Sequence, residues 1–207
     1  MKAIATPKYS GAISIQGARQ AIAGAAGDVL RLPYLSAYSP SMQAKVRDWL
    51  QAGKAGDWLL NKYPQVHMVR TDKSLYDYVE GLKLEYMRNA GLLHKVAFDS
   101  KIHVVRNALG LHTRRAIAHG GRLNARHEIH VASMFKSTPE AFLRMICVHE
   151  LAHLREMDHD KPFYQLCTHM EPTYHQLEFD VRLYLTYLDT GGTPLWEGGE
   201  RSVDAKV

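Results

Sequence analysis

The sequence has little cysteine and no long hydrophobic run. Its 207 residues include only two cysteines, Cys147 and Cys167, too few for a disulfide framework, so both are expected to be free and buried. No apolar stretch approaches the roughly 20 residues that a membrane-spanning helix needs, so no membrane partner is expected. Pro7, Lys8 and Gly11 interrupt the N-terminal apolar residues too early for a signal-peptide core, which predicts a cytoplasmic protein.

The chain also lacks a strong excess of one charge. Lys and Arg number 26 against 21 Asp and Glu, a formal net charge of +5, which is compatible with an acidic partner but does not require one. Several arginines lie close together in one segment, and on a shared face they could contact phosphate, so a nucleic-acid partner stays open. Clustering in the sequence alone, however, favours a solvated strand face. These arginines are Arg106, Arg114, Arg115, Arg122 and Arg126.

The first half of the chain predicts helices. Apolar residues at helical spacing indicate one helix that begins at Ser41 and stops at Gly53. A second helix has Ser74 as its N-cap, carries one apolar stripe and has Gly91 beyond its end as a C-cap. We therefore expect residues 1–95 to form a helical N-terminal extension.

From residue 101 onward the apolar residues alternate, which is the period of a β-strand. Turn residues, most clearly Gly120 and Gly121, separate the alternating segments. A small antiparallel or mixed sheet is therefore expected, with antiparallel pairing favoured. Its strands come from three segments, residues 101–106, 113–119 and 127–135.

A strong helix is predicted directly after this sheet, over residues 141–156. Its start is marked either by Thr138 as N-cap with a proline in the first turn, or by Ser137 and Glu140 as a capping box. A last helix, over residues 174–188, has an apolar stripe that predicts packing against the core. Together the helices and the small sheet indicate the α+β class.

The sequence H-E-L-A-H lies in the helix predicted over residues 141–156. His149 and His153 are four residues apart, so a helix would hold their Cβ atoms about 5 to 6 Å apart and both imidazoles could bind one ion. A catalytic Zn²⁺ site has three protein ligands and leaves the fourth position for water. Glu150 lies beside this pair, where a carboxylate can take a proton from the water. We therefore interpret the two histidines as zinc ligands and Glu150 as the general base.

A third ligand is needed, and His159 is the first candidate. In an unbroken helix His159 would lie about 120° from the ligand face, so the helix must end before it. Asp160 and Pro162 can open a new helix, which lets the chain turn back at residues 157–160. Three alternatives stay open on later parts of the chain: Glu178, His169 and His175.

The run HELAHLREMDHDKPFYQLC resembles the YgjP-like metallopeptidase family. The pattern of that family is H-E-L-x-H, five residues, His, then a basic residue and Phe followed by an aromatic residue. The likeness spans roughly residues 101–188 and is firmest over residues 142–167. The matching positions are His149, Glu150, His153, His159, Lys161, Phe163 and Tyr164.

This resemblance implies a zincin-like fold, related to the WLM and SprT-like proteases, with a small sheet packed on the active-site helix. It implies a zinc-dependent metallopeptidase in which His149, His153 and His159 are the ligands and Glu150 is the catalytic base. It also implies that residues 127–135 form the edge strand beside the cleft, where an extended peptide could pair by strand addition.

Two other classes of function stay open. The same activated water could hydrolyse a different bond, for instance a phosphoanhydride, and a wide basic pocket in place of a peptide groove would favour that class. A non-catalytic zinc module or nucleic-acid adaptor would instead close the site with a fourth ligand, Glu178 or His169.

The group that stabilises negative charge opposite the metal is not distinguished by its spacing in the sequence. Candidates downstream of the motif are Tyr164, Tyr174, His169 and His175. Histidines of the predicted strands could also enter the cleft: His103, His112, His119, His127 and His130.

The expected organisation has three parts. These are the helical extension over residues 1–95, a zincin-like metallopeptidase domain over residues 96–190, and a flexible C-terminal tail over residues 191–207, in which Trp196 could dock. The expected function is that of a cytoplasmic zinc metallopeptidase acting on a peptide or protein substrate. No feature of the sequence sets an oligomeric state.

Overall fold

The structure, a computed structural model, describes residues 30–102, 110–119 and 122–196, and gives the backbone alone for residues 110–119 and 122–126. The chain divides into two compact units, Met1–Arg31 and Leu32–Val207. The fold described below is that of the second unit.

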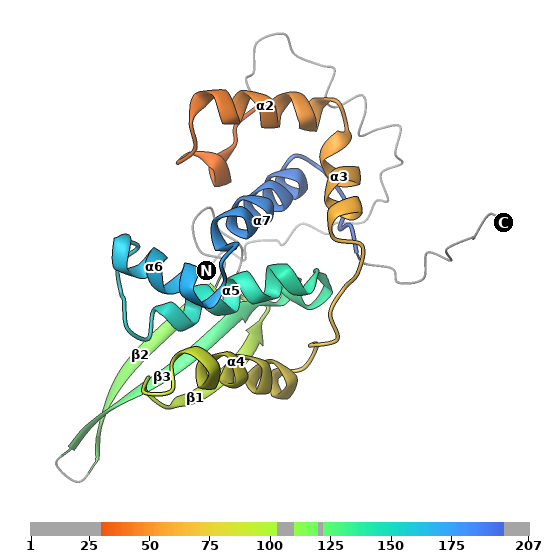
Figure 1. Cartoon of the computed structure of the whole chain (residues 1–207). Coiled ribbons are helices and arrows are strands. Elements are labelled where there is room, and N and C mark those ends of the chain that lie inside the picture. The colour runs from red at the N-terminus through yellow and green to blue at the C-terminus, as the bar shows by residue number, and fades with distance from the viewer. Residues whose placement is uncertain (1–29, 103–109, 120–121, 197–207) are drawn as a thin grey trace, which may run out of the picture. The chain divides into compact units, whose positions relative to one another are not determined.

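Six α-helices, two short 3₁₀ helices and three strands make up the described part of this unit (Figure 1). In chain order they are η1 (Pro33–Leu35), α2 (Pro40–Gln51), α3 (Lys54–Lys62), α4 (Asp72–Tyr86), β1 (Leu93–Asp99), β2 (Gly110–His119), β3 (Arg122–Ala132), η2 (Ser133–Ser137), α5 (Glu140–Ala152), α6 (Lys161–Met170) and α7 (Tyr174–Asp189). The α+β class is therefore confirmed.

The sheet has the strand order β1-β3-β2. The strand β2 pairs with β3 in antiparallel register, but β1 runs parallel to β3. The antiparallel pairing favoured from the sequence is therefore wrong for the sheet as a whole. The strand β1 was not predicted, and its burial does not alternate strictly in the structure.

The position of β3 corrects a second expectation. Residues 127–135 were expected to form an edge strand, but residues 127–131 of β3 pair with β1 on one side and with β2 on the other, so this stretch is central in the sheet. The segment also ends its strand at Ala132 and continues as η2. The predicted strand over residues 101–106 lies mostly outside the described residues.

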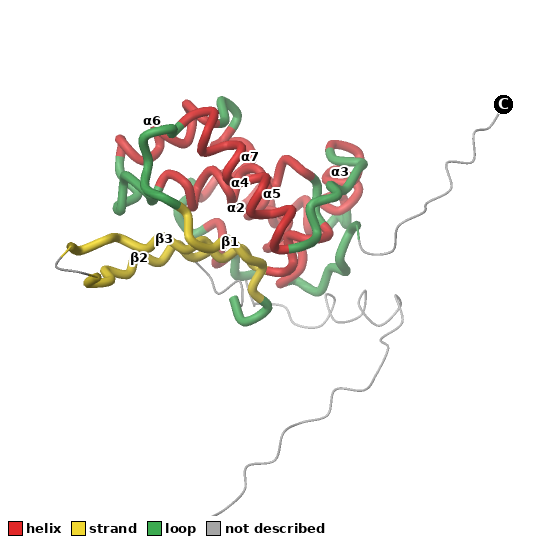
Figure 2. The backbone as a smooth tube through the Cα atoms, turned by 90° about the horizontal axis from the view of Figure 1, so that it is seen from below, coloured by secondary structure: helices red, strands yellow, loops and turns green. Residues whose placement is uncertain are grey.

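The helices cover one face of the sheet. Figure 2 shows the strands along one side of the helices of residues 32–190, and α4 packs on β1 while α5 packs on β2 and β3. Ile129 and Val131 alternate along β3 and are fully buried, which is the period expected for a strand with one covered face. The helix that carries the H-E-L-A-H motif therefore lies directly on the sheet.

Local signals explain most helix boundaries. Ser39 caps α2, and Thr71 with Ser74 forms a capping box at α4, so α4 starts before the position predicted from Ser74 alone. Gly53, the predicted stop of the first helix, adopts φ 67°, a left-handed conformation that glycine allows without strain. Gly91 lies where an added Cβ would come within 2.9 Å of the His127 ring, so it is required for close packing.

The N-terminal helices belong to the same compact unit as the sheet. The helix α4 packs on α5, and α3 packs on α7, so no boundary between compact units falls near residue 95. Trp196 is docked as expected, since its Nε1 donates to the Tyr63 carbonyl over 2.8 Å. The division into a helical extension, a catalytic domain and a C-terminal tail stays a prediction. No described helix combines the length and apolar character of a membrane span.

One buried carboxylate ties α3 to α7. Asp180 is fully buried and its Oδ2 lies 2.6 Å from both Lys62 Nζ and the Tyr63 hydroxyl, while Gln176 Nε2 donates to Oδ1 over 2.8 Å. Such a carboxylate is stabilised only while its donors stay in place, because a buried charge without partners is costly.

Replacing Asp180 with Ala tests this link. The variant leaves the Tyr63 hydroxyl without its acceptor, so we expect the free energy of unfolding to fall by about 3 kcal/mol in urea denaturation. Asp189→Ala on the same helix removes an exposed carboxylate and should change it by less than about 0.5 kcal/mol. Equal effects of the two variants would contradict the assignment.

Candidate metal centre

The end of α5 carries the first two histidines of the site. His149 lies in the last turn of α5, and His153 is the residue that caps its C-terminus, still with helical dihedral angles. Their rings have centroids 5.0 Å apart. The helix ends four residues earlier than predicted, and this early end allows the chain to reverse before His159.

The reversal of the chain brings His159 to the other two histidines. The new helix predicted from Asp160 and Pro162 is confirmed: the Asp160 side chain caps α6 by accepting from the Phe163 backbone N–H over 3.2 Å. The Nε2 atoms of His159 and His149 are then 3.1 Å apart. One ligand nitrogen from each of the three histidines lies within 4.8 Å of the others.

The second ring nitrogens of two histidines are already engaged. His153 Nδ1 lies 2.9 Å from the Glu156 carbonyl oxygen, which only accepts, so this nitrogen carries the proton. His149 Nδ1 lies 2.7 Å from the Tyr174 hydroxyl. Both imidazoles therefore present Nε2 toward the space that they share with His159.

This geometry suits a small divalent ion with nitrogen ligands. Two nitrogens held about 2.0 to 2.1 Å from a tetrahedral Zn²⁺ lie about 3.3 Å apart, close to the 3.1 Å between Nε2 of His149 and Nε2 of His159. Hydrogen bonds to the outer nitrogens are also the usual support of histidine ligands. A divalent metal thus fits the donor set.

An apolar residue lies beneath all three imidazoles. The Phe163 ring is fully buried, and its centroid lies 4.7 to 5.0 Å from the ring centroids of His149, His153 and His159. Because Phe163 belongs to the first turn of α6, the start of that helix sets the floor of the site. The helices α5, α6 and α7 meet in this region, as Figure 1 shows.

The surroundings keep two of the imidazoles neutral. Burial, followed by the nearby His153, His159 and Arg182, lowers the pKa of His149 to about 3. Burial also lowers the pKa of His153. Neutral imidazole is the form that binds a metal, so the site holds these ligands ready at neutral pH.

The catalytic candidate Glu150 lies on α5 directly after His149, and it is 2% exposed. A residue one position along a helix points about 100° away from its neighbour, so the Glu150 side chain stands at the flank of the histidine pair. Glu150 therefore lies in surroundings poor in water, and its role as the base stays a prediction.

The rival ligands lie elsewhere. Glu178 Oε1 accepts from Arg182 through Nε at 3.2 Å and Nη2 at 2.8 Å. The His169 ring packs on Tyr86, and the His175 ring packs on Tyr164. Among the described residues no other His, Cys, Asp or Glu joins the three histidines. The closed four-ligand site of a zinc module thus finds no support in the described part of the chain.

The two strand-region histidines whose side chains are described, His127 and His130, do not join the three histidines of the site. His127 is buried against Gly91. His130 lies between Asp99 and Glu128, at 3.7 and 3.5 Å. The predictions for the side chains of His103, His112 and His119 lie outside what the structure describes.

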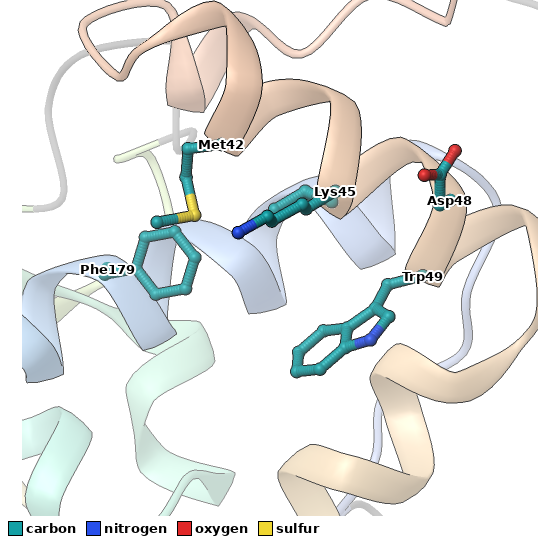
Figure 3. A pocket seen from close by; sticks show the side chains of 6 residues that line it. Met42, Lys45, Asp48, Trp49 and Phe179 are labelled. Atoms are coloured by element: carbon teal, nitrogen blue, oxygen red, sulfur yellow. The ribbon is translucent and has the colours of Figure 1, made fainter.

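A pocket of about 380 Å³ is lined by none of the three histidines. It lies between α2 and α7, and its lining is mostly apolar (Figure 3). Its lining residues are Met42, Lys45, Val46, Asp48, Trp49 and Phe179. No proposed metal ligand lines it, so we do not assign it to the site.

Comparison with known proteins adds to this geometry. A family model described as "YgjP-like, metallopeptidase domain" matches residues 119–180, which include all three histidines and Glu150. A protein of Escherichia coli (strain K12) named UTP pyrophosphatase is 52% identical over 160 residues, 77% of this chain and 96% of that relative. The chain belongs to the YgjP-like family. The resemblance noted from the HELAH run is confirmed, and no solved structure matches this YgjP-like chain.

The prediction of a peptidase is wrong. The name of the YgjP-like relative specifies UTP, a substrate with phosphoanhydride bonds. The error has a physical reason. A metal and a carboxylate base activate a water molecule in the same way for attack on a peptide bond and for attack on a phosphoanhydride bond. The groups around the metal that bind the substrate decide which type of bond is hydrolysed, and these groups are not part of the H-E-x-x-H motif.

Reasoning from the sequence missed the link between Tyr174 and His149. Tyr174 was one of four candidates downstream of the motif, and none was distinguished by spacing. Its position as the first residue of α7 was predicted. The packing of that helix end beneath His149 depends on how α5 and α7 meet, which no local pattern reports.

Removing each histidine in turn tests the site. We expect the purified wild-type protein to hold one zinc ion per chain. The variants His149→Ala, His153→Ala and His159→Ala should bind zinc more than about 100-fold more weakly, a larger loss than removal of a residue that only hydrogen-bonds to a ligand would cause. Elemental analysis after dialysis, with a competition titration, measures this.

The matched controls for that test are His169→Ala, His175→Ala and Glu178→Ala, which should retain stoichiometric zinc. Loss of zinc from Glu178→Ala with retention in His159→Ala would show that the wrong third ligand has been assigned.

Proposed function

We propose that this chain is a zinc-dependent nucleoside triphosphate pyrophosphatase, with UTP as the first substrate to test. The observation that carries the proposal is the 52% identity to a UTP pyrophosphatase over 96% of that relative. The cluster of His149, His153 and His159 beside Glu150 supports it. A zincin-like arrangement, in which the helix of the motif packs on the sheet, is part of the proposal.

Zinc is the proposed metal because three histidine nitrogens suit it, and when bound it supplies a Lewis acid at neutral pH. The side chains then have separate tasks. The three imidazoles hold the ion, and the phenyl ring of Phe163 keeps water from reaching them from below. The carboxylate of Glu150 accepts a proton from the attacking water.

The proposed reaction is a hydrolysis at the α-phosphorus. The oxygen of water forms a bond to this phosphorus, and the bond from the phosphorus to the oxygen bridging the α- and β-phosphates breaks. Glu150 receives one proton from the water and returns it to the leaving pyrophosphate or to solvent. The products are a nucleoside monophosphate and pyrophosphate, so atoms and charge balance.

The charge of the chain fits a polyanionic substrate. The net charge is +5 with a pI near 9.1, which favours encounter with a triphosphate. The strands β2 and β3 carry four of the arginines, and their register sets Arg115 opposite Arg126. These arginines are the cations that we propose for phosphate binding, where arginine offers paired donors.

The test is hydrolysis of UTP by zinc-loaded protein, with pyrophosphate and orthophosphate measured separately. We expect pyrophosphate and UMP in equal amounts, and loss of activity on chelation with recovery on adding zinc. Glu150→Gln should lower kcat about 10²- to 10⁴-fold, which is typical for loss of a general base, while zinc stays bound.

The control for this substitution is Glu85→Gln, which changes an exposed carboxylate on α4 and should leave kcat unchanged. Orthophosphate as the first product would place the cleavage at a different bond. Full activity of Glu150→Gln would remove Glu150 from the proposed mechanism.

A further inference from the structure

The hydroxyl of Tyr174 is the only side-chain group that the structure shows on Nδ1 of His149. Tyr174 is the first residue of α7 and is fully buried. Its oxygen lies 2.7 Å from His149 Nδ1, and the two rings are stacked with an interplanar angle of 18° and centroids 6.4 Å apart. The contact joins residues 25 positions apart, so it exists only because α7 packs against α5.

The direction of this hydrogen bond follows from the form of imidazole that binds a metal. A tyrosine hydroxyl has one proton to donate and lone pairs that accept, and the Cys167 thiol is a second partner of the Tyr174 hydroxyl. A neutral imidazole that binds a metal through Nε2 carries its proton on Nδ1. In that form the Tyr174 oxygen accepts from His149 Nδ1–H, over 2.7 Å.

That direction has a consequence for the metal. An imidazole that carries its proton on Nδ1 has its lone pair on Nε2, and His149 Nε2 is the atom that faces His159.

We propose that Tyr174 is a positioning residue that fixes the tautomer and the ring orientation of His149 and thereby sets the metal affinity of the site. The inference rests on the metal centre proposed above, and it does not depend on which substrate is hydrolysed.

The supports of the two α5 histidines differ in kind. His153 is held by a backbone carbonyl, that of Glu156, which no substitution removes. His149 is held by a side chain, which can be removed without altering the backbone. At Tyr174, the hydrogen bond that supports a histidine ligand can therefore be tested by removing a single oxygen atom.

The deciding variant is Tyr174→Phe, which keeps the ring in the core and removes the hydroxyl. We expect the dissociation constant for Zn²⁺ to rise about 10- to 100-fold, the usual effect of losing an outer partner of a ligand. The measurement is a competition titration with a chelating indicator. The absorption bands of Co²⁺-loaded protein, which report ligand geometry, should also shift.

Two control variants isolate the hydroxyl. Tyr164→Phe removes a hydroxyl from the neighbouring ring, 6.3 Å away between centroids, and should leave Zn²⁺ affinity within twofold of wild type. Cys167→Ala removes the second partner of the Tyr174 hydroxyl and should change affinity less than Tyr174→Phe does, because the bond to His149 survives.

A double-mutant comparison separates positioning from general stability. If Tyr174 acts through His149, Tyr174→Phe should have no further effect on Zn²⁺ affinity in a His149→Ala background, measured at higher zinc concentration. The same loss in both backgrounds would overturn the proposal, because the effect would not pass through His149.

The outcomes also distinguish this proposal from the metal centre itself. If wild type and Tyr174→Phe bind Zn²⁺ equally well, the proposed role of Tyr174 is wrong, but the metal centre is still supported. Wild type that binds neither Zn²⁺ nor Co²⁺ would overturn both.

Discussion

The site depends on one constraint: three imidazoles must reach a common point although their residues span eleven positions of one chain. A continuous helix cannot satisfy it, because it would carry His159 about 120° from the other two. The chain satisfies it by ending α5 at Ala152 and starting α6 at Lys161 under the Asp160 cap. The first turn of α6 then also supplies Phe163, which packs on all three rings.

The parts of the fold farther from the site serve this constraint. The sheet holds α5 on one face through Ile129 and Val131. The helix α7 brings Tyr174 to the outer side of His149, and Asp180 on the same helix fixes α7 to α3. The N-terminal helices therefore pack on the helices that carry the metal centre, although they supply none of the three histidines.

The contrast between the predicted peptidase and the UTP pyrophosphatase named for the relative shows what a catalytic motif determines. A metal with a water and a neighbouring carboxylate produces a nucleophile, and this nucleophile can attack a carbonyl carbon or a phosphorus atom. The family name and the name of the E. coli relative differ in this respect, although both denote hydrolytic enzymes. Selection of the bond requires groups that recognise the substrate, and the arginines of β2 and β3 are the ones that we propose for this role.

The sequence by itself determined two things: the family, and the three histidines that can bind a metal. It could do so because the spacing of ligands on a helix and the signals that end and restart a helix are local. Asp160 and Pro162 predicted the start of α6, and the stripe of residues 174–188 predicted α7. Only the tertiary structure decided the parallel pairing of β1, the central position of β3 and the contact between Tyr174 and His149. These features join segments far apart in the chain, and their energy comes from packing between elements, which no pattern within a single segment encodes.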